Sequence, residues 1–292
     1  MTSLLIDVSG YIHRAFHALP AMQRPSDGLP TNAINGIMRM FWRLKRDVAG
    51  ATHFVPVFDA PGRTKRHEIY PSYKAQRAPK PPELTQQLDF VREAVDAFGF
   101  PVVELRGYEA DDLIAGYAEA LSDEGFDVLV VSADKDLMQL IGPGIGQFCP
   151  LKDKRLGAAD AIEKFGVMPR HIPEAQGLIG DTTDNIPGVK GIGPKGAGTL
   201  LASYGSIEGI FDNLHEITAK GVRSKLEAAG RDIALLSREL ATLDRSTPLP
   251  LPTEALASRE IDVDAVLRFS ERMEFRSFAA DFASHYGVGV PS

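Results

Sequence analysis

Three short apolar runs in the first half of the chain each stop on an aspartate. They cover residues 4–7, 54–59 and 128–134. Continuous apolar runs of this length are typical of strands buried on both faces, as in a parallel sheet. Between them the pattern becomes helical, around residues 31–48, 83–98 and 109–124, with one more short strand at 102–105. Residues 1–157 therefore predict an α/β region with a mainly parallel sheet.

The second half of the chain follows a different pattern. From about residue 158 onward, short helical patterns alternate with glycine turns, and strand patterns are few. We therefore predict a helical region over residues 158–292. Within it, residues 186–200 predict a hairpin between two helices, and the proline-rich stretch 247–252 predicts an extended connector.

Acidic residues gather where the predicted strands end. In a parallel sheet the carboxyl ends of the strands face the ligand crevice, so acids at and near these ends should meet there. Like charges in one cleft repel each other, and hard divalent cations with oxygen ligands relieve that repulsion. The sequence thus predicts a Mg²⁺ site that acts on phosphate, built from Asp7, Asp59, Glu109, Asp111, Asp112, Asp134, Asp136, Asp181 and Asp184.

Some of these acids also have a simpler interpretation. Capping and the helix macrodipole favour acids in a first turn, which accounts for part of Glu109-Ala110-Asp111-Asp112. Three acids in four positions exceed what capping uses, and this favours the metal site. The segment Asp134-Lys135-Asp136 is also compatible with a solvated turn. Asp181-Thr182-Thr183-Asp184 is equally compatible with an Asx turn and a helix cap.

Composition sets broad limits. The chain has 292 residues, of which 44% are hydrophobic and 24% charged, as in ordinary globular proteins. One cysteine excludes an intrachain disulfide, and neither a secretory signal pattern nor a membrane-spanning run is visible. These features predict a cytoplasmic protein without a membrane partner. The net charge of −7 disfavours simple polyanion binding, but a local basic patch is compatible with it.

Such a patch lies at residues 63–80, where six basic residues face one acid, Glu68. Tyr70 and Tyr73 stand among the cations. This mixture favours phosphate contacts together with base stacking on a single strand, although a solvated charged face is the alternative. Because the patch follows the strand that ends at Asp59, we expect it to overhang the acidic cleft.

The segment Pro187-Gly188-Val189-Lys190-Gly191-Ile192-Gly193-Pro194-Lys195-Gly196 carries a second phosphate signal. It matches a dinucleotide fingerprint in spacing, but no strand precedes it. It is not a Walker loop either, because Pro194 and Gly196 stand where that motif needs other residues. A helical hairpin fits better, since glycine turns let backbone N–H groups approach a phosphate while Lys190 and Lys195 add charge. A plain helix–helix turn is the alternative.

Taken together and in this order, the motifs resemble those of the 5′ nucleases. This family includes the 5′→3′ exonuclease domain of bacterial DNA polymerase I, phage 5′ exonucleases and the flap endonucleases. The resemblance covers nearly the whole chain. It rests on Ile6-Asp7-Val8-Ser9-Gly10, Phe58-Asp59-Ala60, Tyr73-Lys74-Ala75-Gln76-Arg77-Ala78-Pro79, Gly107-Tyr108-Glu109-Ala110-Asp111-Asp112, Ser132-Ala133-Asp134-Lys135-Asp136, Gly180-Asp181-Thr182-Thr183-Asp184-Asn185-Ile186-Pro187-Gly188, Gly191-Ile192-Gly193-Pro194-Lys195 and Met273-Glu274-Phe275.

The resemblance implies a three-layer α/β nuclease core like that of the PIN-type nucleases, with a helical arch at about residues 62–95. It also implies two positions for Mg²⁺, which Mn²⁺ can replace. Both positions share Asp111. The first would use Asp7, Asp59, Glu109 and Asp111, with Asp112 nearby, and the second would use Asp134, Asp136, Asp181 and Asp184.

The resemblance further implies which residues meet DNA. Lys74 and Arg77 would lie beside the scissile phosphate, with Arg66 as a further candidate and Tyr73 among the DNA contacts. A helix–hairpin–helix would bind the duplex backbone, and K⁺ through main-chain carbonyls, by Gly188, Lys190, Gly191, Gly193 and Lys195. The family usually has Thr where this chain has Gly196, and Gly198 is a second weak helix former. Each glycine costs up to about 1 kcal/mol of helix propensity, which predicts a weaker hairpin or cation site.

The activity implied is that of a structure-specific 5′→3′ exonuclease and 5′-flap endonuclease in replication and repair. Two ions about 4 Å apart would activate water and hold the scissile phosphate. The expected partners are 5′ flaps, duplex 5′ ends and RNA primer ends, met by a monomer at the bacterial nucleoid. A PIN-like ribonuclease and a non-catalytic DNA-binding module are the alternatives. The first would normally be shorter and lack the hairpin, and the second is disfavoured because no family carboxylate is missing.

Overall fold

One sheet organises the first half of the chain. In the computed structural model, which describes residues 1–48 and 50–289, five strands lie in the order β2-β1-β3-β4-β5. β1 is parallel to both β2 and β3, β4 is parallel to β3, and β5 runs antiparallel to β4. The predicted fold class, an α/β region with a mainly parallel sheet, is confirmed. The strands are β1 (Thr2–Asp7), β2 (Ala51–Val57), β3 (Asp127–Val131), β4 (Ile145–Cys149) and β5 (Lys154–Leu156).

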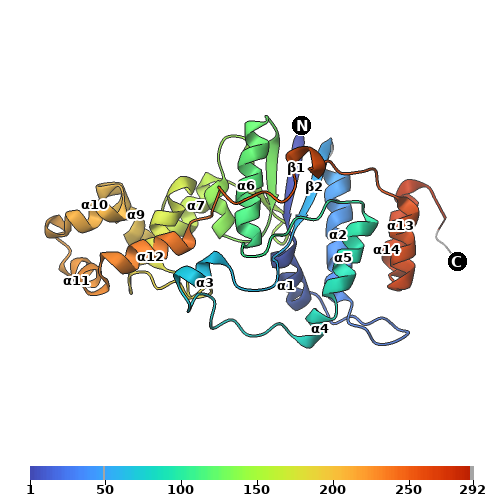
Figure 1. Cartoon of the computed structure of the whole chain (residues 1–292), viewed down its shortest axis with the longest axis horizontal. Coiled ribbons are helices and arrows are strands. Elements are labelled where there is room, and N and C mark those ends of the chain that lie inside the picture. Colours follow the sequence, from blue (N-terminus) through green and yellow to red (C-terminus); the bar gives the residue numbers. More distant parts are fainter. Residues whose placement is uncertain (49, 290–292) are drawn as a thin grey trace.

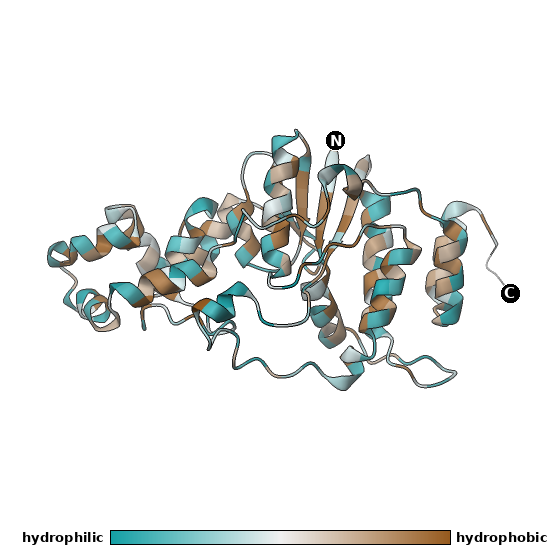
Figure 2. Cartoon of the chain, viewed as in Figure 1, coloured by the Kyte–Doolittle hydropathy of each residue, from teal (hydrophilic) through white to brown (hydrophobic). Residues whose placement is uncertain are grey.

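Helices cover both faces of this sheet (Figure 1). Leu4 of β1 packs in a core with α2 (Asn32–Asp47) and α5 (Leu88–Ala97), while the next residue, Leu5, packs against α6 (Ala110–Asp123) on the other face. In Figure 2 the central strands are brown, that is, hydrophobic. Neither face of these strands meets water, which is why their sequences are apolar throughout rather than alternating.

The other helices before residue 150 are short or lie near the cleft. They are α1 (Val8–Ala18), α3 (Lys65–Ile69), α4 (Pro82–Thr85) and the 3₁₀ helix η1 (Asp136–Leu140). The predicted helix at 83–98 is therefore broken between α4 and α5. Gln87 lies at this break, and its buried side chain accepts from the Ala33 N–H at 2.8 Å and donates to Asn32 Oδ1 at 3.0 Å. Its side chain thereby caps α2, while its backbone forms the N-cap of α5.

Two strands were absent from the sequence prediction. β4 and β5 lie at one edge of the sheet, and the β4 sequence, with Gly146 and Gln147 in its middle, lacks the apolar run of the central strands. β5 is the edge strand, and β4, which lies between β3 and β5, is only partly buried, so neither has the continuous apolar pattern of a strand covered on both faces. Conversely, the strand predicted at 102–105 is reduced to one parallel bridge between Val103 and Val57.

The second half is helical in the described residues, as predicted. It contains α7 (Ala158–Phe165), η2 (Pro169–His171), α8 (Ile172–Ile179), α9 (Pro194–Tyr204), α10 (Ile207–Asp212), η3 (Leu214–Glu216), α11 (Lys220–Ala229), α12 (Arg231–Ala241), η4 (Thr253–Leu256), α13 (Val263–Arg272) and α14 (Arg276–Tyr286). The elements from α7 to α12 share a separate apolar core, which includes Leu178 and Leu200. No helix among the described residues is long and apolar enough to cross a membrane.

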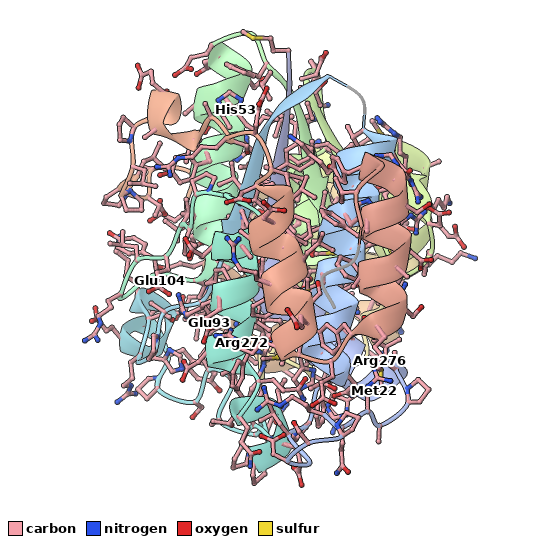
Figure 3. All side chains as sticks on the ribbon, turned by 90° about the vertical axis from the view of Figure 1, so that its right-hand side faces the viewer. Met22, His53, Glu93, Glu104, Arg272 and Arg276 are labelled. Atoms are coloured by element: carbon pink, nitrogen blue, oxygen red, sulfur yellow. The ribbon has the colours of Figure 1, made fainter. Side chains whose placement is uncertain are left out.

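The last two helices do not belong to that core. α13 and α14 pack instead on the α2 and α5 side of the sheet, where Phe278 and Phe282 enter the same core as Leu4. Arg272 of α13 forms an ion pair with Glu93 of α5, and Figure 3 shows this side of the molecule. The predicted helical region, residues 158–292, therefore differs from the structure at its end. The apolar faces of α13 and α14 are buried against the first region. Helical periodicity predicts that such a face is buried, but it does not identify the segment that covers it.

Residues from about 62 to 87 run along the molecule as the predicted arch, from α3 to α4 (Figure 1). The arch is shorter than the predicted 62–95, because α5 packs into the core through Val91 and Val95. Its middle, residues 75–80, is exposed. The arch thus connects two buried anchors and leaves its basic middle part open to solvent.

The predicted helix–hairpin–helix is formed by α8, the turn 187–193 and α9. Gly188 (φ +59°) lies so close to Gly180 that a Cβ on it would be 2.3 Å from the Gly180 nitrogen. Gly198 of α9 lies against the end of α7, and a Cβ there would be 2.4 Å from the Gly166 carbonyl oxygen. Gly196 has space, because its Cβ would meet only Ile192 Cγ2 at 3.7 Å. One of the two weak helix formers is therefore required by packing and the other is not.

These two glycines should respond in opposite directions to alanine. We expect Gly196→Ala to stabilise the protein by up to about 1 kcal/mol through helix propensity. Gly198→Ala should destabilise it by about 1–3 kcal/mol, because backbone atoms must move apart. Urea unfolding of both variants measures this difference. Equal effects would mean that the α7–α9 contact is not as tight as described.

Candidate functional site

The carboxyl ends of three neighbouring strands each deliver an aspartate. Asp7 ends β1, where Oδ1 accepts from the Gly10 N–H at 2.8 Å and Oδ2 from the Ser132 hydroxyl at 2.7 Å. A Cβ at Gly10 would be 2.3 Å from Asp7 Oδ2, so glycine is needed there. Ser132 also accepts from the Asp134 N–H at 2.9 Å. Asp59 follows β2 and Asp134 follows β3, so the parallel sheet brings these positions to one edge, as predicted.

The N-terminus of α6 adds three more acids. Asp112 accepts from the Glu109 N–H at 3.4 Å, and the two form a capping box. Asp59 Oδ1 accepts from the Ala110 N–H at 2.8 Å, which holds α6 against the end of β2. Capping, the simpler of the two interpretations made above, therefore accounts for Asp112. It does not account for Asp111, which makes no cap.

The remaining acids come from the loops around η1 and before the hairpin. Asp181 Oδ1 accepts from the Thr183 N–H at 2.7 Å, so the Asx turn considered above is present. Its other oxygen pairs with Lys135. Asp136 Oδ1 accepts from the Gln176 amide at 2.7 Å. Asp181 thus pairs with a cation in addition to its own turn, whereas Asp136 is bonded to a neutral amide.

Crowding changes the acidity of these groups. Burial, together with repulsion from Asp134 and Asp59, raises the pKa of Asp7 to about 6, although hydrogen bonds from Ser132 and Gly10 oppose the rise. Burial and the neighbouring Asp134, Asp7 and Asp59 raise the pKa of Asp111 well above its ordinary value. Burial and Asp134 likewise raise the pKa of Asp136 to about 7. The carboxylates lie close enough to disfavour each other's ionised form.

This donor set has the chemistry that a hard divalent cation requires. Carboxylate oxygens are the ligands that Mg²⁺ and Mn²⁺ prefer, and their mutual repulsion is what a cation would relieve. In the described part of the chain, however, no group of three or more His, Cys, Asp or Glu side chains is arranged to hold a metal ion. The residues thus fit the ion by chemistry, while the two metal positions stay a prediction.

Lys74 of the arch reaches into this cluster. Its Nζ lies 2.9 Å from Glu109 Oε2 and 3.7 Å from Asp184 Oδ2. Burial opposes its charge, but these two carboxylates outweigh burial and raise the pKa of Lys74. The backbone of Lys74 has a φ of 55°, a left-handed conformation that few non-glycine residues adopt. Its N–H donates to the Asp184 carbonyl at 2.9 Å, which fixes that conformation.

Arg77 and Tyr73 belong to the same arch segment but differ in exposure. Arg77 is half-exposed and lies 2.6 Å from Asp184 Oδ1. Tyr73 is 3% exposed, and its hydroxyl lies 3.1 Å from Glu109 Oε2 and 3.2 Å from Asp184 Oδ2. The stacking of this ring on a base, expected from the sequence, does not agree with its burial. Tyr73 instead supports the two carboxylates that Lys74 contacts.

Arg66 is also buried, at 7% exposure. Its guanidinium makes a bidentate pair with Asp112 at 2.6 and 2.7 Å and lies 3.3 Å from Glu109. It also donates to the carbonyls of Leu240 at 2.8 Å and Thr242 at 2.9 Å, at the end of α12. The predicted role in DNA contact does not suit a side chain with this many internal partners. Arg66 joins the arch, α6 and the helical region.

The hairpin lies on the helical region and begins beside the turn that carries Asp181, because Ile186 pairs with Asp181 and Gly188 packs on Gly180. Lys190 and Lys195 are exposed, and Gly193 caps the N-terminus of α9, where Pro194 takes the first position. Gly191 has a φ of +84° and its carbonyl accepts from Lys225 of α11 at 2.9 Å. The hairpin therefore carries two exposed lysines, while its Gly191 carbonyl is already in use.

Sequence reasoning missed several residues that hold the site. Ser132, Lys135 and Gln176 contact Asp7, Asp181 and Asp136 respectively. Ser132 and Lys135 belong to the acidic motif 132–136, but the sequence did not show which carboxylate each of them would contact. Gln176 carried no signal, because it comes from a helix distant in sequence from Asp136.

Comparison with known families gives a consistent result. Residues 2–166 match the model of the 5′-3′ exonuclease N-terminal resolvase-like domain, and residues 167–264 match that of the 5′-3′ exonuclease C-terminal SAM fold. The junction between these matches lies nine residues beyond the predicted boundary at 157, which stays a prediction.

Individual proteins extend this comparison. The chain is 38% identical over 276 residues to the 5′-3′ exonuclease of Aquifex aeolicus, covering 94% of this chain and 93% of that protein. It is 42% identical over 277 residues to DNA polymerase I of Rhizobium leguminosarum, covering 93% of this chain but 27% of that protein. The chain thus spans about a quarter of the polymerase.

A solved structure shows the same fold. The bacteriophage T5 D15 flap endonuclease, in a pseudo-enzyme-product complex with DNA and metal ions, superposes with a TM-score of 0.66 at 22% identity. The match covers 97% of this chain and 98% of that one.

The raised pKa values predict how pH acts on the metal-free protein. Asp7 and Asp136 hold protons in the folded state up to about pH 6 and 7, whereas their ordinary pKa is 3.8. The folded state therefore binds more protons than the unfolded state in this window, so its stability should fall as pH rises. We expect urea unfolding in EDTA to show this loss between pH 4 and 7, and Mg²⁺ to reverse it at pH 7.5. Stability that is flat or rising with pH, without metal, would contradict the crowding.

Proposed function

Because this chain belongs to the 5′-3′ exonuclease family, we propose that it is a Mg²⁺-dependent nuclease that cuts DNA at 5′ flaps and duplex 5′ ends. The observation that supports this most directly is the arch itself. Lys74 pairs with Glu109 and Arg77 with Asp184, near the buried Asp111, whose repulsion by neighbouring carboxylates a divalent cation would relieve. The divalent cations and the side chains of Lys74 and Arg77 would then surround a phosphate placed at this site.

We propose that two divalent cations are held by the carboxylates at the sheet edge. When bound, they would supply water activation and stabilise the leaving oxygen. Asp111 would face both ions, because the charges of Asp7, Asp59 and Asp134 all repel its carboxylate. Asp112 would act differently from the first expectation. Its bidentate pair with Arg66 occupies both of its oxygens, so it would hold Glu109 in place rather than bind an ion.

Lys74 and Arg77 would neutralise charge that develops on the phosphoryl oxygens. Both now pair with Glu109 or Asp184, and divalent cations that bind these carboxylates would compete for them. The two side chains would then be free to turn toward the phosphate. Tyr73, which is buried between the same two acids, would keep them oriented.

The helical hairpin would hold the duplex part of the substrate. Lys190, Lys195 and the first N–H groups of α9 suit phosphate contacts that carry no base specificity. A K⁺ ion at the hairpin stays part of this proposal. The Gly191 carbonyl already accepts from Lys225, so other carbonyls would have to bind it.

Substrate shape rather than base sequence would select the cleavage point. We propose that Mn²⁺ replaces Mg²⁺, that RNA primer ends are also accepted, and that the protein works as a monomer near the bacterial nucleoid. The exposed middle of the arch, residues 75–80, supports recognition of a single strand beside a duplex.

Cleavage of a 5′-flap DNA, run against a single-stranded RNA of the same sequence, tests the proposal. We expect Mg²⁺-dependent cleavage of the flap and none in excess EDTA. Asp111→Asn should reduce the single-turnover rate by several orders of magnitude and leave flap binding in Ca²⁺ intact or tighter, because one negative charge is removed. Full activity in EDTA, a preference for the RNA, or an Asp111→Asn rate within about tenfold of wild type (about 1.4 kcal/mol) would each contradict it.

Lys74 and the hairpin lysines should separate chemistry from binding. Lys74→Ala should slow single-turnover cleavage by orders of magnitude with little loss of affinity, because its ammonium faces the reacting phosphate. Lys195→Ala or Lys190→Ala should weaken binding to all duplex sequences and reduce the salt slope by about one unit per lost contact. If Lys74→Ala shows only the second behaviour, the assignment of the arch lysine to chemistry is wrong.

A further inference from the structure

Gln176 links the helical region to the acidic cleft. It lies on the last turn of α8, one turn before Asp181, and is 1% exposed. Its Nε2 donates to Asp136 Oδ1 at 2.7 Å. Among the described residues no other side-chain donor lies within hydrogen-bonding distance of that carboxylate, and the charges that act on it are those of Asp134, Lys135, Asp181 and Asp184.

The other end of the same amide is unsatisfied. Gln176 Oε1 is buried and has no hydrogen-bond partner among the described residues. A buried carbonyl oxygen without a donor is costly and rare in folded proteins. The amide group thus turns its donor toward Asp136 and leaves its acceptor oxygen unpaired in the protein interior, among the described residues.

We infer that Gln176 is a positioning residue for the ion bound at Asp136. Its N–H fixes the direction of the Asp136 carboxylate, and its free oxygen accepts from water that a hydrated divalent cation brings with it. Side chains that orient a metal ligand typically change metal affinity when they are replaced. The inference rests on the proposed function, because it assumes a cation at this carboxylate.

The position of Gln176 gives this contact a second consequence. The backbone carbonyl of Gln176 accepts from the Gly180 N–H at 2.7 Å, and Gly180 packs on Gly188 of the hairpin. The helix that leads into the hairpin is thus also the helix that orients Asp136. α8 would therefore fix the position of a duplex bound at the hairpin relative to an ion bound at Asp136.

Two variants with opposite expected signs test the inference. In full-length protein stripped with EDTA, Mn²⁺ binding is followed by calorimetry and by the rise in Tm, without DNA. Gln176→Leu removes the donor and the acceptor at similar volume, and should weaken Mn²⁺ binding about tenfold. Gln176→Glu sets a second carboxylate against Asp136. It should lower the metal-free Tm but bind Mn²⁺ at least as tightly as wild type.

Ile172→Val is the matched control, because Ile172 is buried on the same helix, within the apolar core of the helical region. It should lower Tm slightly and leave the Mn²⁺ titration unchanged. If both Gln176 variants behave like Ile172→Val, Gln176 has only a packing role and the inference is overturned. If the Gln176 variants shift Mn²⁺ binding as expected but the wild type does not cut flap DNA, the proposed function fails and the positioning role stands.

Discussion

The arrangement of this protein depends on electrostatic repulsion at one edge of its sheet. Parallel strands bring Asp7, Asp59 and Asp134 together, and α6 adds Asp111 beside them. Burial makes the repulsion stronger, because the carboxylates lose the water that would screen them. The surrounding segments respond with positive charge. Lys74, Arg77 and Lys135 come from two different loops, and each pairs with an acid of the cluster or of the adjoining turn.

Arg66 also pairs with an acid, and it connects the α/β region to the helical region. Its side chain is buried, and its partners come from α6 and from the end of α12. A buried guanidinium with five donors can satisfy a carboxylate and two carbonyls at once, which a lysine cannot do with the same geometry. Gln139 strengthens the joint, since its amide donates to the Ala241 carbonyl and accepts from the Leu243 N–H. The helical region is thereby joined through Arg66 to Glu109 as well.

The sequence located the acids well and the supporting residues poorly. Apolar runs that end on aspartate identified the three central strands and the acids at their ends, because a strand buried on both faces has a distinct composition. The arch was recognised by its cations, yet two of its members were assigned the wrong surroundings. Tyr73 and Arg66 stand in an exposed-looking basic segment, but their side chains turn into the protein. Charge and aromatic content do not reveal which way a side chain points.

What the sequence determined by itself was local: the periodicity of strands and helices, the acids at strand ends and the glycine pattern of the hairpin. Only the tertiary structure decided which distant groups meet. It placed Gln176 on Asp136, α13 and α14 on the α2–α5 side of the sheet, and Gly198 against Gly166. The physical reason is that periodicity reports how much of an element is buried, whereas the identity of its partner depends on packing between segments far apart in the chain.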